Sequence, residues 1–494
     1  MDNIEIIINK YFYIGEIDPR IYGSFVEHMG RVIYTGIYEP EHPLADEDGF
    51  RKDVIEAVKN LGITSIRYPG GNFVSAYNWE DGVGPKEERP RRVELAWRAI
   101  ETNAFGTNEF MKWMKKINAE PMLAVNLGLG GIKDAVQYLE YCNFPNGTKY
   151  SDMRISHGVT LPYQVKTWCL GNEMDGPWQI GHKTASEYGR IAQETAKAMK
   201  VMDPSIELVS CGSSLNTMDT FPEWEAQTLD YTYEYVDYIS LHQYFAGQDM
   251  GTEKFLAQAD QMDEYIKTVA STCEYIKAKK RSDKSLNISF DEWGVWAYDC
   301  SETVKQCNEV EWQIAPPISE MIYTFEDSLL FAGMLLALLK NVNCVKMACQ
   351  SLLTNVSATI MTEKGGGIWL QPTYFPFAQV AKHGHGLVLD SRKNQKNKSI
   401  DSVVVYHEAI NEMVLFVINR SLCEDIEIEY TLQGFEGKTV LEHSLMECED
   451  PKMTNAINHE AIKPRNVSYT QIKNGNVYSN IVKLSWNMIR IGLK

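Results

Sequence analysis

The sequence lacks a hydrophobic segment long enough to cross a bilayer. Its longest uninterrupted apolar run, Leu329–Leu339, has about half of the ~20 residues that a transmembrane helix needs, and we expect a buried helix there. The N-terminal residues MDNIEIIINK contain no basic stretch followed by a long apolar core, so no signal peptide is predicted. Both absences predict a cytoplasmic protein with no membrane partner.

Clustered cysteines and an excess of positive charge are also missing. The 494 residues include 10 cysteines but no Cys-x-x-Cys pair, which is typical of reduced, buried thiols in the cytosol rather than of a disulfide scaffold. Lys and Arg number 48 against 66 Asp and Glu, a net charge of −18. Because phosphate-rich partners require basic surfaces, this balance argues against a general binder of nucleic acid or anionic membranes.

What the sequence does contain is a repeated strand-and-helix pattern. Short apolar runs, each becoming polar or glycine-rich at its C-terminal end, alternate with amphipathic helical segments. This alternation predicts parallel strands covered by helices, and eight repeats predict a (β/α)8 TIM barrel. The expected strands are Ile21–Glu27, Ile63–Gly70, Pro121–Gly128, Val165–Glu173, Ile206–Ser213, Tyr238–Tyr244, Asn287–Gly294 and Val345–Leu353, and the clearest helices are Phe50–Leu61, Thr107–Asn118, Lys183–Met202, Gly251–Lys280 and the segment around Leu329–Leu339.

The pattern changes after about Asp390. Alternating segments follow one another without a useful helical pattern between them, which predicts an antiparallel, jelly-roll-like β-sandwich. The N-terminal segment Ile4–Asn9 precedes the barrel and can join this domain. We therefore expect a barrel over residues 15–385 and a sandwich built from residues 1–14 and 386–494. Its clearest strands are Ser402–Tyr406, Met413–Ile418, Ile426–Tyr430 and Val482–Ile491.

Two glutamates mark the expected site. Functional groups of such barrels lie at the C-terminal ends of the strands, and Glu173 and Glu292 each close an apolar run, where a charge is costly unless it is paired or functional. They fall on the fourth and seventh strands, nearly across the barrel mouth from each other. Two facing carboxylates are what glycosidic hydrolysis requires. The alternative is that each glutamate is an ion-paired residue of the barrel rim.

Neighbouring residues suggest a different role for each glutamate. Asn172 precedes Glu173 and is placed to hydrogen-bond a sugar 2-hydroxyl, which favours Glu173 as the acid/base. Tyr244 and Arg67 are placed to hold Glu292 as an anion by hydrogen bond and charge, which favours Glu292 as the nucleophile.

Two tryptophans follow the glutamates closely. Trp178 and Trp296 each lie a few residues after one of them. Aromatic faces beside a few polar groups suit sugar binding, so we expect both to form walls of the site. The alternative for any single aromatic residue here is ordinary packing in the barrel or its loops.

Longer segments around these residues carry a resemblance to a known family. The sequence resembles glycoside hydrolase family 51, the retaining α-L-arabinofuranosidases of clan A, over nearly the whole chain. The segments are IYGSFVEHMGRVIYTGIYEP (Ile21–Pro40), RYPGGNFVSAYNWEDGVGPKEERPRR (Arg67–Arg92), LGNEMDGPWQIGHKTASEYGR (Leu170–Arg190), DYISLHQY (Asp237–Tyr244), FDEWGVW (Phe290–Trp296) and SWNMIRI (Ser485–Ile491).

The resemblance implies a fold, an activity and a set of site residues. It implies the barrel and a sandwich that includes the N-terminal strand. It also implies an exo-acting retaining enzyme, without metal or other cofactor, that releases terminal arabinofuranose from oligosaccharides of arabinan and arabinoxylan. Cytoplasmic location and a homohexamer are implied as well. Glu173 matches the acid/base and Glu292 the nucleophile, Glu27, Asn72, Asn172 and Tyr244 match residues that hold the sugar in the −1 subsite, and His242 lies close by.

One position departs from the family pattern. Leu352 stands where family members often have a glutamine that touches the sugar, and Gln350 lies two residues earlier. Because residues i and i+2 share a face of a strand, Gln350 is expected to reach inward from a lower level. This departure leaves open a β-D-xylosidase, a mixed-specificity furanosidase or an endoglucanase on the same scaffold.

Two functions of other classes are weaker alternatives. A non-catalytic carbohydrate-binding protein is disfavoured because Glu173, Glu292 and Asn172 are all present. A metal-dependent barrel hydrolase would use the pair His383 and His385, but this pair follows the eighth strand rather than the first. We therefore expect loop histidines there and no metal site.

Overall fold

Eight parallel strands form a closed barrel in this computed structural model, which describes residues 4–247, 250–296, 300–309, 312–394 and 397–494. Every strand predicted for the barrel is present, so the TIM-barrel prediction is confirmed. The strands are shorter than predicted at several ends, because the polar C-terminal residues belong to loops. In chain order they are β2 (Gly23–Phe25), β3 (Ser65–Tyr68), β6 (Glu120–Val125), β7 (Thr167–Leu170), β8 (Glu207–Ser210), β9 (Tyr238–Phe245), β10 (Asn287–Val295) and β11 (Val345–Gln350).

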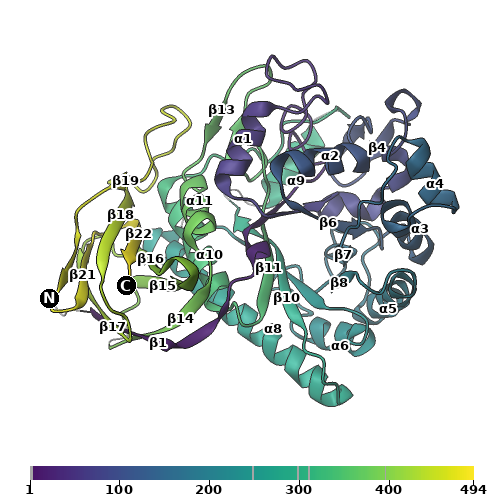
Figure 1. Cartoon of the computed structure of the whole chain (residues 1–494). Coiled ribbons are helices and arrows are strands. Elements are labelled where there is room, and N and C mark those ends of the chain that lie inside the picture. Colours follow the sequence, from purple (N-terminus) through teal and green to yellow (C-terminus); the bar gives the residue numbers. More distant parts are fainter. Residues whose placement is uncertain (1–3, 248–249, 297–299, 310–311, 395–396) are drawn as a thin grey trace.

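Helices surround the barrel strands (Figure 1). The predicted segment 251–280 is two helices, α7 and α8, which meet at Gln258. Local capping explains several boundaries: α1 ends at Gly62, whose φ of +83° few other residues adopt, and α5 begins with a Thr184–Glu187 capping box. The helices are α1 (Lys52–Leu61), α2 (Thr107–Ile117), α3 (Ile132–Asn143), α4 (Lys149–Ser156), α5 (Ala185–Met202), α6 (Glu223–Thr232), α7 (Thr252–Ala257), α8 (Ala259–Lys280), α9 (Cys300–Glu309), α10 (Phe325–Lys340) and α11 (Tyr374–His383).

A ten-stranded curled sheet forms the second domain, and β1 runs from it to the barrel (Figure 1). Nearly all its neighbours pair antiparallel, as predicted, but β1 pairs in parallel with β17, with Ile4 opposite Ile428. The strand order is β19-β18-β22-β16-β15-β14-β1-β17-β21-β20. The strands are β1 (Ile4–Glu16), β14 (Leu387–Lys393), β15 (Ile400–His407), β16 (Glu412–Asn419), β17 (Ile426–Gln433), β18 (Thr439–Glu447), β19 (Arg465–Asn466), β20 (Thr470–Lys473), β21 (Asn476–Ile481) and β22 (Ser485–Gly492).

The central strands of this sheet are buried on both faces. In β15, Val403 and Val405 belong to the apolar cluster that includes the barrel, whereas Val404 and Tyr406 belong to the core enclosed by the curled sheet. The alternation expected for Ser402–Tyr406 is therefore corrected: because both faces of β15 are buried, its residues are continuously apolar in the centre of the strand. The sheet domain is thereby packed onto the barrel rather than tethered to it.

The apolar run predicted to be a buried helix lies in α10, whose residues Phe325–Leu339 are all buried. Among the described residues, no helix combines the length and the hydrophobicity needed to cross a membrane. The domain limits 15–385 and 386–494 stay a prediction.

Candidate active site

The two predicted glutamates lie close together at the barrel mouth. Glu173 lies three residues beyond the end of β7, in a left-handed backbone conformation with φ of +45°, and Glu292 lies in β10, paired in register with His242 of β9. One carboxylate oxygen of each glutamate and one ring nitrogen of His242 lie within 4.8 Å of one another. Both glutamates are buried, with 8% and 5% of their surface exposed.

Two donors hold the carboxylate of Glu173. His242 Nδ1 lies 3.0 Å from Oε1, and Trp178 donates its Nε1–H to Oε2 at 2.6 Å. Each oxygen therefore has one partner on the protein side, which fixes the plane of the carboxyl group and leaves its remaining lone pairs for another molecule.

A different pair of donors holds Glu292. Arg67 Nη1 donates to Oε1 at 2.8 Å, and the Tyr244 hydroxyl lies 2.9 Å from Oε2. Arg67 also donates through Nη2 to Asn172 Oδ1, so one guanidinium group orients both a glutamate and the asparagine beside the other glutamate. The sequence-based expectation that Arg67 and Tyr244 contact Glu292 is met by these contacts.

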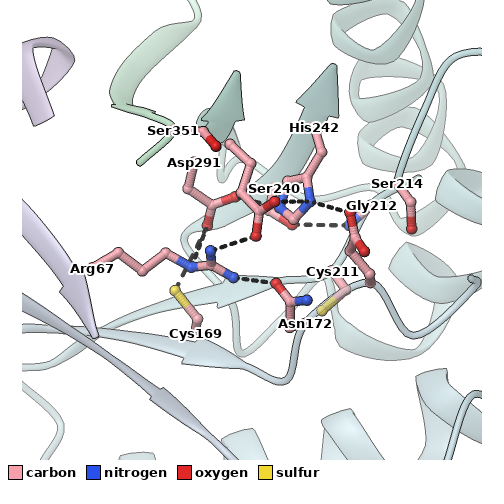
Figure 2. A network of polar contacts seen from close by, with 12 residues as sticks. Arg67, Cys169, Asn172, Cys211, Gly212, Ser214, Ser240, His242, Asp291 and Ser351 are labelled. Atoms are coloured by element: carbon pink, nitrogen blue, oxygen red, sulfur yellow. Dashed lines mark hydrogen bonds and ion pairs between the residues drawn. The ribbon is translucent and has the colours of Figure 1, made fainter. Parts of the chain in front are cut away.

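Asp291 supplies a further carboxylate to this network, beside His242 and Arg67 (Figure 2). Its Oδ1 lies 3.0 Å from His242 Nε2, and its Oδ2 lies 3.7 Å from Arg67 Nε. Consecutive strand residues normally point to opposite faces, but the pairing register of β10 shifts between Ser289 and Glu292. Such a bulge re-aims side chains, and it lets both Asp291 and Glu292 approach His242.

Glu27 and Asn72 extend the site toward the loop after β3. Glu27 Oε1 accepts hydrogen bonds from the Phe73 backbone N–H and from Trp97 Nε1, both at 2.9 Å. A Cβ atom at Gly71 would lie 2.9 Å from an oxygen of Glu292 and 3.1 Å from one of Glu27. Glycine at position 71 therefore lets the loop pass against both carboxylates.

The charges in the site move several pKa values. Burial, reinforced by the charge of Glu292, raises the pKa of Glu173 above its ordinary value. Burial alone would lower the pKa of His242, but the charges of Glu292 and Asp291 and the hydrogen bonds to Asp291 and Glu173 outweigh it and raise that pKa to about 10. Burial and the charge of Glu292 raise the pKa of Glu27 to about 7. At neutral pH the site thus contains a protonated imidazole among its carboxyl groups.

The two predicted wall tryptophans are placed differently. Trp178 is 47% exposed and touches the site through its hydrogen bond to Glu173. Trp296 packs edge-on against Tyr244, with ring centroids 5.3 Å apart and an interplanar angle of 78°. Each therefore contacts a residue of the glutamate network: Trp178 contacts Glu173 and Trp296 contacts Tyr244.

Gln350 is the predicted residue that the structure does not bring to the glutamates. Its amide nitrogen hydrogen-bonds the Ser24 hydroxyl at 3.3 Å. The preceding residue, Cys349, lies on the side of the strand that faces Arg67 and Glu292, because the charges of these two groups affect the pKa of its thiol. Because neighbouring strand residues point to opposite faces, Gln350 is turned away from these groups.

Sequence reasoning missed three residues of the site: Asp291, Trp97 and Ser351. Asp291 was hidden by the expected alternation of the strand, and Trp97 comes from a hairpin, β4 (Arg92–Glu94) and β5 (Ala99–Glu101), with no sequence signal of its approach. Ser351 Oγ lies 2.7 Å from the Tyr244 hydroxyl. The sequence signal that could have identified Ser351 was its position, one residue beyond the last barrel strand.

Some side chains of the site are of types that bind metal ions, although no metal site was predicted. Glu173, His242 and Glu292 lie close enough to share an ion, but both ring nitrogens of His242 face carboxylates at 3.0 Å and serve as donors to them. Over the described ranges, His383 and His385 join no group of three ligating side chains. His385 instead packs edge-on against the Tyr22 ring at 5.9 Å.

Family models cover most of the chain. Residues 57–267 match the Alpha-L-arabinofuranosidase 1 domain, and residues 291–485 match the Alpha-L-arabinofuranosidase C-terminal domain. The two matches together contain Glu173, Glu292 and the residues that contact them.

Relatives align from end to end. The chain is 53% identical to the intracellular exo-α-(1→5)-L-arabinofuranosidase of Acetivibrio thermocellus, with 100% of both chains covered. It is 42% identical to an exo-α-(1→6)-L-arabinofuranosidase of Bifidobacterium longum, over 99% of this chain and 98% of that protein. A solved family 51 α-L-arabinofuranosidase from Bifidobacterium longum superposes with a TM-score of 0.93 at 38% identity, covering 99% of each chain. The chain belongs to glycoside hydrolase family 51, the family of these α-L-arabinofuranosidases.

Proposed function

We propose that this protein is an exo-acting, retaining α-L-arabinofuranosidase in which Glu292 is the nucleophile and Glu173 the acid/base. The observation that carries the proposal is the approach of the two carboxylates to within 4.8 Å, with His242 between them. Retaining glycosidases place these groups about 5–5.5 Å apart, whereas inverting enzymes leave about 6.5–9.5 Å for a water molecule. The spacing supports retention.

In the first step Glu292 attacks the anomeric carbon while Glu173 protonates the departing glycosidic oxygen. Burial and the charge of Glu292 favour the protonated form of Glu173, which is the form that an acid requires. Arg67 and Tyr244 each hydrogen-bond one carboxylate oxygen of Glu292 and hold the group in place in the site. The products of this step are the free aglycone and an arabinosyl ester of Glu292.

In the second step water replaces the enzyme ester. Esterification removes the negative charge of Glu292, and with it one of the causes that raise the pKa of Glu173. Glu173 then accepts a proton from water, the hydroxide oxygen bonds to the anomeric carbon, and Glu292 departs as a carboxylate. Two inversions return arabinose in its original configuration.

Rescue by azide tests both roles. Glu292→Ala is expected to abolish hydrolysis of 4-nitrophenyl α-L-arabinofuranoside, and azide is expected to restore turnover with an inverted arabinosyl azide as the product. Glu173→Ala is expected to retain attack on this activated substrate, with azide giving the retained product. Near-wild-type activity of Glu292→Ala would contradict the assignment.

We propose that the remaining predicted residues, apart from Gln350, hold the terminal arabinofuranose. Asn172 and Asn72 lie beside the two glutamates, with Asn172 Nδ2 3.4 Å from Asn72 Oδ1, and Glu27 is fixed by two donors. The substrates that we propose are α-(1→5)-linked arabino-oligosaccharides, because the relative at 53% identity is named for this linkage. A panel of α-(1→5)-, α-(1→6)- and α-(1→3)-linked arabinobiosides tests this choice.

The proposal extends to location and assembly. Several relatives are named intracellular, and we propose a cytoplasmic homohexamer acting on imported arabinan- and arabinoxylan-derived oligosaccharides. Light scattering of the purified protein should give six times the mass of one chain. The buried Leu352, in place of the usual glutamine, is the feature that favours comparison with aryl β-D-xylopyranoside; faster hydrolysis of that substrate would favour a xylosidase.

A further inference from the structure

A serine outside the expected site touches the tyrosine that holds the nucleophile. Ser351 follows β11 directly and is buried. Its backbone N–H donates to the carbonyl of Trp293 at 3.0 Å, which ties it to β10 beside Glu292. Figure 2 shows Ser351 at the edge of the polar network. Its hydroxyl lies 2.7 Å from that of Tyr244.

Tyr244 has two acceptors for one proton. Its hydroxyl oxygen lies 2.9 Å from Glu292 Oε2 and 2.7 Å from Ser351 Oγ, but a phenol carries a single donor hydrogen. A hydrogen bond to an ionised carboxylate is roughly twice as strong as one between neutral groups. While Glu292 is charged, the proton of Tyr244 therefore points to Glu292 even though Ser351 is nearer.

The balance changes when Glu292 becomes an ester. The carboxylate then has no negative charge, so both acceptors are neutral and the shorter contact, to Ser351, is favoured. A buried hydroxyl without an acceptor is costly. Ser351 provides an acceptor for the Tyr244 proton while Glu292 is an ester and therefore a weaker acceptor.

We infer that Ser351 is a positioning residue that accepts the Tyr244 proton while Glu292 carries the sugar, so that the Tyr244 hydroxyl turns with the charge of the nucleophile. This inference rests on the proposed function, since it requires an ester at Glu292. The turn breaks no covalent bond: the O–H of Tyr244 rotates from one acceptor to the other and returns when Glu292 departs as a carboxylate.

The consequence is a specific change in kinetics. Ser351→Ala leaves the resting enzyme intact but destabilises the ester intermediate, so less of it accumulates. For an aryl arabinofuranoside whose second step is slow, KM is expected to rise roughly threefold to tenfold, as for the loss of one hydrogen bond, while kcat does not fall. The pre-steady-state burst of phenol shrinks accordingly. Ser351→Thr, which keeps the hydroxyl, is expected to restore KM.

A second variant separates this role from a general packing effect. Because Ser351 acts through Tyr244, adding Ser351→Ala to Tyr244→Phe should change neither kcat nor KM further. The matched control is Ser357→Ala, because Ser357 Oγ also lies 2.7 Å from a tyrosine hydroxyl, that of Tyr323. This control is expected to keep the wild-type KM and burst while showing a similar change in melting temperature.

Three results would overturn the inference. An unchanged KM in Ser351→Ala is one, and an equal effect of Ser357→Ala is another. A fall of kcat and KM together is the third, because it would mean that Ser351 donates to Tyr244 and stabilises the departing carboxylate. If the wild-type enzyme hydrolyses no arabinofuranoside, the proposed function itself fails; if it does and Ser351→Ala behaves as the control does, only this inference fails.

Discussion

Replacing Trp178 by phenylalanine should move the pH dependence of catalysis in one direction. Trp178 Nε1 donates to Glu173 Oε2 at 2.6 Å, and this bond stabilises the anion and lowers the pKa of Glu173 against the larger effect of burial. Phenylalanine retains the aromatic ring but removes the donor. The pKa of Glu173 should therefore rise, and a larger share of the enzyme should hold the proton that the first step needs.

The size of the effect follows from the hydrogen bond and its exposure. A hydrogen bond to a charged group contributes roughly 1.5–3 kcal/mol. Trp178 is 47% exposed, so in the variant a water molecule can donate to Glu173 in place of the indole and recover part of this energy. About 1 kcal/mol remains, and since 1.36 kcal/mol corresponds to one pKa unit, the basic limb should shift upward by roughly 0.5–1 pH unit.

The assay is the pH profile of kcat/KM for 4-nitrophenyl α-L-arabinofuranoside, whose limbs report groups of the free enzyme. Trp296→Phe is the matched control, because Trp296 packs on Tyr244 and its ring nitrogen has no hydrogen-bond partner among the described residues. The control should lower activity without moving the basic limb. A downward shift in Trp178→Phe, or an equal shift in both variants, would refute the reasoning.

Three further changes have defined outcomes. Tyr244→Phe removes a donor from Glu292 and should lower kcat/KM by roughly 10- to 100-fold, with the melting temperature checking that the fold is intact. Gly71→Ala places a methyl group 2.9 Å from a Glu292 oxygen and should lower kcat/KM at least ~10-fold, more than it changes the melting temperature. Asp401→Asn should reduce the free energy of unfolding at pH 7 by about 2 kcal/mol, because it removes the buried carboxylate that pairs with Lys340 and with Arg420, which keeps only the more exposed Asp260 as a partner. The folded-state pKa of Asp401 lies below its ordinary value despite burial, so the stability it contributes is present at neutral pH and lost as pH falls; urea titrations of wild type and variant should converge in acid.

Much of the barrel could be predicted because its strands are buried on both faces. Such strands are continuous apolar runs, and the point where each becomes polar marks the barrel mouth. Helices with little amphipathic contrast, such as α4 and α6, were not singled out. The gaps were larger in the sheet domain, where β20 has an alternating pattern of partly exposed residues and the parallel pairing of β1 with β17 joins segments more than 400 residues apart.

Part of the candidate site could be predicted from polar residues at the C-terminal ends of the barrel strands. Glu173, Glu292, Arg67 and Tyr244 were predicted in this way, and in the structure Arg67 and Tyr244 hydrogen-bond Glu292. Position along a strand is a poor guide where the strand is irregular. The register shift in β10 brings Asp291 to His242, and no local sequence pattern announces a bulge.

His242 connects the two halves of the proposed reaction. It faces Glu173 at 3.0 Å, Asp291 at 3.0 Å and Glu292 at 3.5 Å. With the charge of Glu292 present the pKa of His242 is raised to about 10, so the imidazole is positive in the resting enzyme, and its contact with Asp291 remains when Glu292 is esterified. When Glu292 is ionised, its negative charge balances the imidazolium of His242, so Glu173 can hold a proton and be neutral. When Glu292 is esterified, Asp291 and Glu173 remain to balance the imidazolium, which favours the anionic, basic form of Glu173. A fixed cation between two carboxylates thereby makes the protonation of one depend on the charge of the other, as an acid that must become a base requires.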